Sequence, residues 1–218
     1  MASHEALSEN LHGAAAAESA WEGGGSPFAT YHNKLGMWLF IISDAITFSA
    51  LLMAYSYVRV ASPDWPTPFE FYPALIKATG MTVILLSSSL TMVMAVRAAK
   101  LGERGSAVKW LLATMAGGLA FVLIHATEWV GLIGEGLRLF KNPWGGSPLF
   151  GASFFTLTGL HMTHVICGVV YLGVIALGHG KGKFDADDVE VSGLYWHFVD
   201  LVWMFIFPLV YILSLKMR

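Results

Sequence analysis

The stretch Phe154-Phe155-Thr156-Leu157-Thr158-Gly159-Leu160-His161-Met162-Thr163-His164-Val165 decides the fold, because it places two histidines inside a long apolar run. The run extends from Phe150 to Leu177 and contains no Asp, Glu, Lys or Arg. At about 1.5 Å of rise per helical residue, it exceeds the hydrocarbon core of a bilayer, which is about 30 Å thick. The sequence therefore predicts a membrane-spanning helix in which His161 and His164 lie near mid-membrane and face protein rather than lipid.

The composition of the whole chain agrees with a membrane protein. Of its 218 residues, 56% are hydrophobic and 13% are charged, and so few ionisable groups cannot cover the surface of a soluble globular enzyme. The formal net charge of −2 gives no basis for nucleic-acid binding. The single cysteine, Cys167, excludes an intrachain disulfide.

Apolar segments long enough to cross a bilayer as helices occur five times, at Leu35–Val58, Ala74–Val96, Ala107–Leu132, Phe150–Leu177 and Gly193–Leu215. The loops between them are short and contain prolines or glycines, so consecutive helices are expected to be neighbours. Residues 1–33 lack an apolar block and are expected to be a tail that is disordered or held by a partner. The prediction is an all-α membrane protein, with a bundle of five transmembrane helices over residues 34–218.

Basic residues near the ends of the spans predict the orientation. Arg97, Lys100, Arg104 and Lys109 crowd around the loop between the second and third spans. Concentrated Lys and Arg in a short loop resist translocation. We therefore expect a cytoplasmic N-terminus and a periplasmic C-terminus.

An acid lies deep inside the first span. Asp44 follows Lys34 by ten residues, which places it roughly 15 Å along a helix and near the midplane. An unpaired carboxylate there is costly, so the neutral acid is favoured. Two roles are consistent with this position: Asp44 holds a proton for transfer, or it ties two helices or a lipid headgroup together by a hydrogen bond.

Two other spans carry an acid and a histidine three residues apart, so that each pair shares a helix face. His125 and Glu128 lie toward the outer end of the third span, where an interfacial hydrogen bond is expected. His197 and Asp200 lie near the inner end of the fifth span and can neutralise each other. A haem or metal site needs ligands that converge at one depth. Because these histidines and His161 are expected at different depths, we expect no haem or metal in this chain.

The same residues carry a resemblance to a known family. In chain order the motifs are the following stretches: Leu35-Gly36-Met37-Trp38-Leu39-Phe40 with Ser43-Asp44, then Glu128-Trp129, then residues 154–165, and finally Tyr195-Trp196-His197-Phe198-Val199-Asp200-Leu201-Val202-Trp203. With these motifs, residues 34 to about 215 closely resemble subunit III of the haem-copper terminal oxidases. No motif of an independent catalytic centre, such as a P-loop or a dinucleotide fingerprint, occurs beside them.

The resemblance implies a supporting subunit of a respiratory enzyme in the bacterial inner membrane. Such a chain binds no redox cofactor and packs against subunits I and II, whose haems and copper reduce oxygen to water while protons are pumped. Cytochrome c or a quinol donates the electrons. Subunit III of this family binds structural phospholipid in a cleft between its helices, supports proton uptake by subunit I and protects the oxidase from inactivation during turnover.

The resemblance also implies roles for particular residues. Asp44 occupies the position of the family's buried carboxylate and is the candidate for proton-uptake support. The candidates for a lipid-binding site or an inter-helix polar network are His125, Glu128, His161, His164, His197 and Asp200.

The sequence departs from the commonest family pattern in several places. It has five predicted spans where seven are usual, which matches the bacterial form that lacks the first two and part of the lipid cleft. An aspartate at position 44 is similar to the pattern of the ubiquinol oxidase branch, whereas Glu128-Trp129 and Tyr195 look more like the pattern of the cytochrome c branch. His125 stands where Gln is common in the family. The sequence favours cytochrome c as the electron donor and leaves a quinol as the alternative.

Three further interpretations are consistent with the chain alone. A membrane protein associated with nitric oxide reductases is a relative of subunit III and lacks a distinguishing site. An independent membrane cytochrome would show a haem absorbance band that depends on His161 or His164. A small proton-coupled transporter that uses Asp44 would be active in vesicles without partner subunits.

Overall fold

The computed structural model describes residues 32–216, so most of the expected N-terminal tail lies outside the described residues. Within that range, five helical segments are long and apolar enough to cross a membrane. The helices are α2 (His32–Ala61), α3 (Ile76–Lys100), α4 (Arg104–Gly134), α5 (Leu149–Gly180) and α6 (Ala186–Ile206). A π-helical turn, η1 (Phe71–Leu75), precedes α3, and a second, η2 (Phe207–Ile212), continues α6. The predicted all-α fold with five transmembrane helices is confirmed.

The helices extend beyond the apolar segments that identified them. The clearest case is α6, which begins at Ala186 rather than at the predicted Gly193. The Asp185 side chain caps this helix by accepting hydrogen bonds from the backbone N–H groups of Asp187 and Asp188, at 3.0 and 3.1 Å. Asp188 in turn accepts from the backbone N–H of Asp185 at 3.1 Å, which completes a capping box. The apolar segment missed this first part of the helix because it is acidic.

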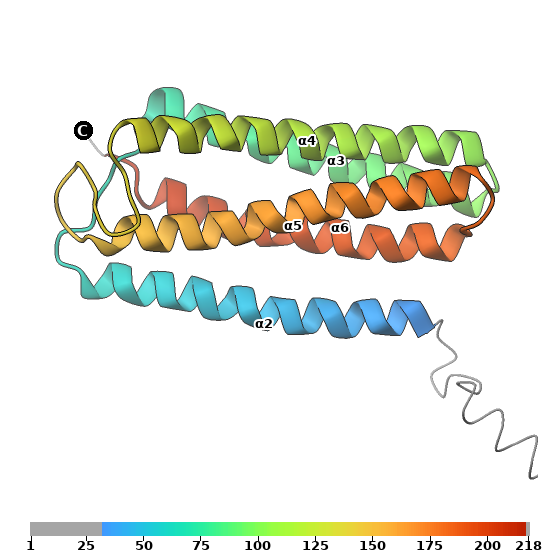
Figure 1. Ribbon diagram of the computed structural model, residues 1–218, viewed down its shortest axis with the longest axis horizontal. Coiled ribbons are helices and arrows are strands. Elements are labelled where there is room, and N and C mark those ends of the chain that lie inside the picture. The colour runs from blue at the N-terminus through green and yellow to red at the C-terminus, as the bar shows by residue number, and fades with distance from the viewer. Residues whose placement is uncertain (1–31, 217–218) are drawn as a thin grey trace, which may run out of the picture.

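Four helices form a bundle, and the fifth lies against one side of it (Figure 1). Helix α4 packs between α3 and α5, and α6 closes the bundle by packing on both α3 and α5. Helix α2 packs on α6 and α5. The expectation that the first two spans are neighbours is therefore wrong, because the connecting segment crosses the end of the bundle before α3 begins. Phe69 anchors that segment in the core, where its ring lies 4.8 Å from Tyr211 and 6.0 Å from Phe154.

Helix α2 contacts the bundle through a narrow stripe. Its buried residues are Ile41, Phe48 and Tyr55, which recur every seven positions. Residues at this spacing lie along one side of a helix, and the remaining large apolar side chains of α2, such as Leu39 and Met53, are exposed. Lipid or another subunit therefore covers most of α2 in the membrane.

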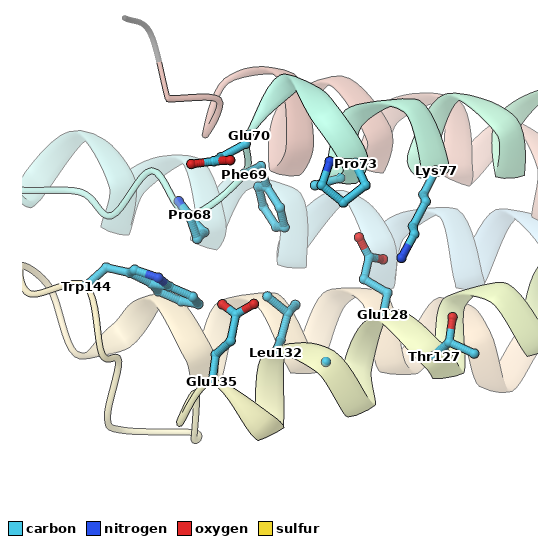
Figure 2. A pocket seen from close by; sticks show the side chains of 12 residues that line it. Pro68, Phe69, Glu70, Pro73, Lys77, Thr127, Glu128, Leu132, Glu135 and Trp144 are labelled. Atoms are coloured by element: carbon cyan, nitrogen blue, oxygen red, sulfur yellow. The ribbon is translucent and has the colours of Figure 1, made fainter.

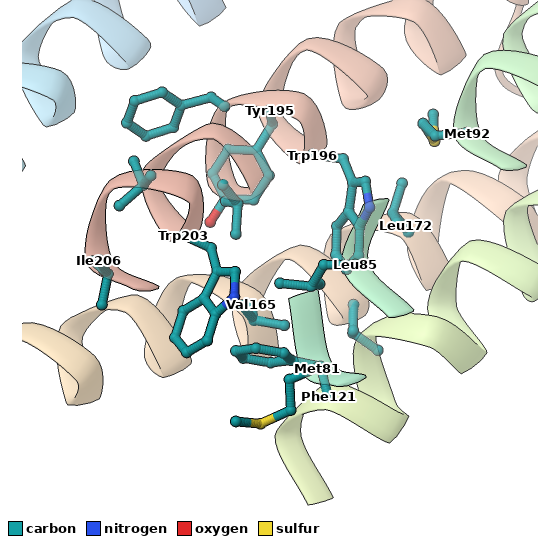
Figure 3. Packing of buried hydrophobic residues seen from close by; sticks show 14 of the residues in the cluster. Met81, Leu85, Met92, Phe121, Val165, Leu172, Tyr195, Trp196, Trp203 and Ile206 are labelled. Atoms are coloured by element: carbon teal, nitrogen blue, oxygen red, sulfur yellow. The ribbon is translucent and has the colours of Figure 1, made fainter. Parts of the chain in front are cut away.

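Two tryptophans of α6 fill the centre of the bundle (Figure 3). Trp196 and Trp203 are fully buried, and their indole N–H groups donate to Ser88 and Thr82 of α3, each at 3.0 Å. The α4 backbone approaches Trp196 closely at Gly118, where a Cβ atom would clash with the indole ring. Small residues let helix backbones approach in membranes, where association depends on packing rather than on the hydrophobic effect.

Candidate functional site

Asp44 of α2 and His164 of α5 meet within the membrane-spanning part of the fold. Asp44 Oδ2 lies 3.1 Å from His164 Nε2, and their side chains are only 13% and 16% exposed. The pair links α2 to the bundle near the middle of the helix. The sequence identified both residues as polar groups inside spans but did not predict that they pair.

The surroundings of His164 fix the tautomer of its imidazole. Nδ1 of His164 lies 2.8 Å from the carbonyl oxygen of Leu160, one turn earlier. A carbonyl only accepts hydrogen bonds, so Nδ1 carries a proton and Nε2 faces Asp44. A hydrogen bond between Nε2 and Oδ2 requires a proton on one of the two atoms, which means either a neutral Asp44 acid or a His164 imidazolium. Either arrangement leaves the pair without net charge.

Apolar and aromatic groups enclose the Asp44–His164 pair. Phe48 of α2 is 2% exposed, and its ring packs edge-on against the His164 ring at 5.2 Å. Tyr195 of α6 donates its hydroxyl hydrogen bond to the backbone carbonyl of His164 at 3.0 Å. The Phe48 ring thus packs against the imidazole of the pair, and the Tyr195 hydroxyl ties α6 to the α5 backbone at the same residue.

A second polar cluster lies on α4 and at the end of α6. His125 Nδ1 is 3.2 Å from Glu128 Oε2, so the two residues face one way as predicted. The Tyr211 hydroxyl of η2 donates to the same carboxylate oxygen at 2.7 Å, a contact that the sequence did not indicate. The Glu128 side chain is only 7% exposed, so its carboxylate is largely buried within the protein.

Glu128 also lines a cavity of about 410 Å³ between η1, α3 and α4 (Figure 2). Glu70, Lys77, Glu135 and Trp144 line the same cavity and face it from the loops and helix ends around it. The cavity therefore connects the end of the bundle with the buried His125–Glu128 pair.

His125 and His161 lie closer to each other in depth than predicted. Their rings lie 5.7 and 5.2 Å from the same ring, that of Trp203. His125 precedes the end of α4 by nine residues, and His161 follows the start of α5 by twelve, so by helical rise their depths differ by only about 5 Å. The prediction overstated this difference, because the predicted span ends at Leu132 and Phe150 already place the two histidines within about 6 Å of each other in depth.

A comparison with known proteins identifies the family. The family model for cytochrome c oxidase subunit III matches residues 11–215. The chain belongs to this family. It is 32% identical over 183 residues to cytochrome c oxidase subunit 3 of Alkalihalophilus pseudofirmus, and the match covers 83% of this chain and 86% of the relative.

Relatives with quinol in their names are equally similar. Quinol oxidase subunit 3 of Bacillus spizizenii is 32% identical over 186 residues, with 84% of this chain and 88% of the relative covered. Cytochrome bo(3) ubiquinol oxidase subunit 3 of Pseudomonas aeruginosa is 31% identical over 185 residues, with 82% and 84% covered. The chain is thus a subunit III of a haem-copper oxidase and a multi-pass protein of the bacterial inner membrane, and its similarity does not separate the two donor classes.

Two residues of the stretch Trp196-His197-Phe198-Val199-Asp200 were predicted to pair, His197 and Asp200. In the structure, His197 Nδ1 instead lies 2.6 Å from the Ser89 hydroxyl of α3, while Asp200 is 5% exposed on α6. His197 therefore ties α6 to α3. A shared helix face permitted the His197–Asp200 pair, but the packing of α3 against α6 provided a nearer partner for the imidazole.

A cluster of three charged residues, which the sequence did not predict, lies at the other end of the subunit. Glu190 of α6 binds Lys34 of α2 at 2.5 Å through one oxygen and Lys100 of α3 at 2.6 Å through the other. The predicted topology had placed both lysines at this end. Glu190 was overlooked because it lies in the acidic first part of α6, outside the predicted span.

Metal binding is not supported by the geometry of the described part of subunit III. Across residues 32–216, no group of three or more His, Cys, Asp or Glu side chains is arranged to hold a metal ion. That the chain carries no redox cofactor stays a prediction from the resemblance.

Proposed function

We propose that this subunit III serves a proton-pumping cytochrome c oxidase. It packs against the catalytic subunit I, with subunit II in the same complex, and the haems and copper of those partners reduce oxygen to water. The chain itself binds no redox cofactor. Its role is to sustain proton uptake by subunit I and to bind structural phospholipid, with its N-terminus on the cytoplasmic side.

The Asp44–His164 pair is the observation that carries the proposed role in proton uptake. Asp44 Oδ2 and His164 Nε2 lie 3.1 Å apart, a distance at which the two side chains can share one proton. The proton can lie on either residue while the pair stays neutral overall, which avoids the large cost of a net charge in an apolar environment. Such a pair can accept a further proton on Asp44 or release the shared one, and so buffer protons near the oxidase.

The identity of the electron donor rests on a few residues. Glu128-Trp129 and Tyr195 resemble the cytochrome c branch, whereas Asp44 resembles the quinol branch. A quinol is therefore the alternative donor. Relatives named for cytochrome c oxidase and for quinol oxidase are equally similar to this chain, so they favour neither donor over the other. Purification in mild detergent through a tag on this chain, followed by oxygen-consumption assays with reduced cytochrome c and with a quinol, tests the choice. Faster consumption with the quinol would overturn the cytochrome c assignment.

Substitutions at Asp44 separate proton storage from a structural tie. Asp44→Asn keeps a hydrogen-bond donor for His164 Nε2 but cannot hold the shared proton, whereas Asp44→Ala removes both. We expect both variants to assemble with normal haem content and a normal initial rate, and to lose activity sooner during continuous turnover. Thr163→Ala is the control, because Thr163 is exposed on α5 next to His164 and its hydroxyl bonds only to Gly159.

The outcomes of this experiment discriminate between the two roles of Asp44. If Asp44→Asn behaves like the wild type and only Asp44→Ala is impaired, the pair is a structural tie. Loss of subunit III from the complex in both variants would lead to the same conclusion. A shortened lifetime in Asp44→Asn, with Thr163→Ala unaffected, supports proton storage.

A further inference from the structure

A groove of about 420 Å³ lies between α3 and α6, and neither member of the Asp44–His164 pair lines it. Its walls are apolar and are formed by Val93, Val96, Leu101, Gly193 and Leu194. His197 lines the same groove, and three charged residues lie at its end: Arg97, Lys100 and Glu190. At Gly193 the two helices approach each other closely, since an added Cβ would lie 3.3 Å from Met92 and Val96.

The charged end of this groove carries an excess of positive charge. Lys34 and Lys100 share the single carboxylate of Glu190. Arg97 adds a third cation from the last turn of α3, one turn before Lys100. Three cations thus face one anion where the groove reaches the end of the helices, and an anionic group would be attracted there.

We propose that this groove binds an anionic phospholipid, with one acyl chain along the apolar walls and the phosphate near Arg97 and Lys100. The inference deepens the lipid-binding role proposed above and rests on it. An acyl chain gains little by leaving the bilayer for an apolar groove, because both surroundings are hydrocarbon. Selectivity must therefore come from the headgroup, and basic pockets between transmembrane helices are suited to anionic headgroups.

Native mass spectrometry of the purified oxidase complex tests this site. The complex is titrated with dioleoylphosphatidylglycerol, which is anionic, and with zwitterionic dioleoylphosphatidylcholine. Val93→Trp fills the groove and should abolish one phosphatidylglycerol site. Leu90→Trp is the matched control, since Leu90 lies one turn away on α3, is 61% exposed and does not line the groove, whereas Val93 is 51% exposed.

A second pair of variants tests the headgroup contact. Arg97→Gln should weaken phosphatidylglycerol binding about fivefold, which corresponds to about 1 kcal/mol for one basic residue near a membrane surface. It should leave phosphatidylcholine binding unchanged. Arg104→Gln, a basic residue at the start of α4 outside the groove, should bind both lipids like the wild type.

Three results would overturn the proposal. Val93→Trp could retain the phosphatidylglycerol site, Arg97→Gln could match Arg104→Gln, or Val93→Trp could release subunit III from the complex. The last result would mean that a neighbouring protein, and not a lipid, occupies the groove. Because these readouts are lipid occupancy, they are independent of the turnover lifetime that tests Asp44.

Discussion

Gly118 should be among the positions in this subunit least tolerant of an added methyl group. A Cβ atom at Gly118 would lie 2.8 Å from Val169 Cγ2 and 3.1 Å from Trp196 Cζ2, and it would overlap the far edge of the indole. Trp196 cannot move away freely, because its N–H donates to Ser88 at 3.0 Å. Gly118→Ala must therefore displace α4 or break this hydrogen bond.

The size of the effect follows from these contacts. Overpacking of a well-filled core costs about 1–3 kcal/mol, and loss of a buried hydrogen bond adds about 1 kcal/mol. The better helix propensity of alanine offsets about 1 kcal/mol of this. The net expectation for Gly118→Ala is a destabilisation of about 1–3 kcal/mol, measured as a lower temperature of thermal dissociation of subunit III from the detergent-purified oxidase.

Gly131→Ala provides the control on the same helix. A Cβ at Gly131 meets no atom within 4 Å, so this variant should be neutral or slightly stabilised by helix propensity. If Gly118→Ala and Gly131→Ala shifted the dissociation temperature equally, the close approach of α4 to Trp196 would not limit stability, and the reasoning would be refuted.

Two further variants test the polar ties between helices. Glu190→Gln should release Lys34 and Lys100 together and destabilise the subunit by only about 1 kcal/mol, because the lysines are partly exposed. Its dissociation temperature should be lower than that of the control Lys181→Gln, and this difference should shrink at high salt. A difference that persists at high salt would argue against an ionic cause. Tyr211→Phe should cost about 1–3 kcal/mol by leaving the buried Glu128 carboxylate without this donor. Tyr57→Phe, at an exposed tyrosine of α2, should change nothing, and equal effects of the two substitutions would show that the hydroxyl of Tyr211 does not contribute.

The sequence alone was sufficient for the fold class, because apolar length is a direct measure of the ability to cross a bilayer. It was less informative at the helix ends. The first turns of α6 are acidic and form a helix because Asp185 caps them, a local signal that apolar length does not detect. The Asp-x-x-Asp spacing at Asp185 and Asp188 could have revealed this start.

The candidate site was predictable as a set of residues but not as a set of pairs. Asp44 and His164 stood out because polar groups inside spans are costly. Their pairing required α2 to lie beside α5, although two helices separate them along the chain. Likewise, His197 could reach Asp200 or another helix, and only the packing of α3 against α6 placed Ser89 next to it.

The attachment of α2 has a consequence for how its sequence can change. Besides the apolar stripe and the Tyr55 hydroxyl, which lies 3.3 Å from that of Ser214, the contacts of three charged residues hold it. These are Lys34 at its start, Asp44 in its middle, and Arg59 at its end, where the guanidinium donates to Ser214 at 2.9 Å and to the Leu213 carbonyl. A slip of α2 by one residue would rotate it by about 100° and shift it by about 1.5 Å, and would break the contacts of all three residues at once. These contacts therefore fix the register of α2 as well as its position. Its lipid-facing positions are free to vary among apolar residues, whereas a one-residue insertion between Lys34 and Arg59 would not be tolerated.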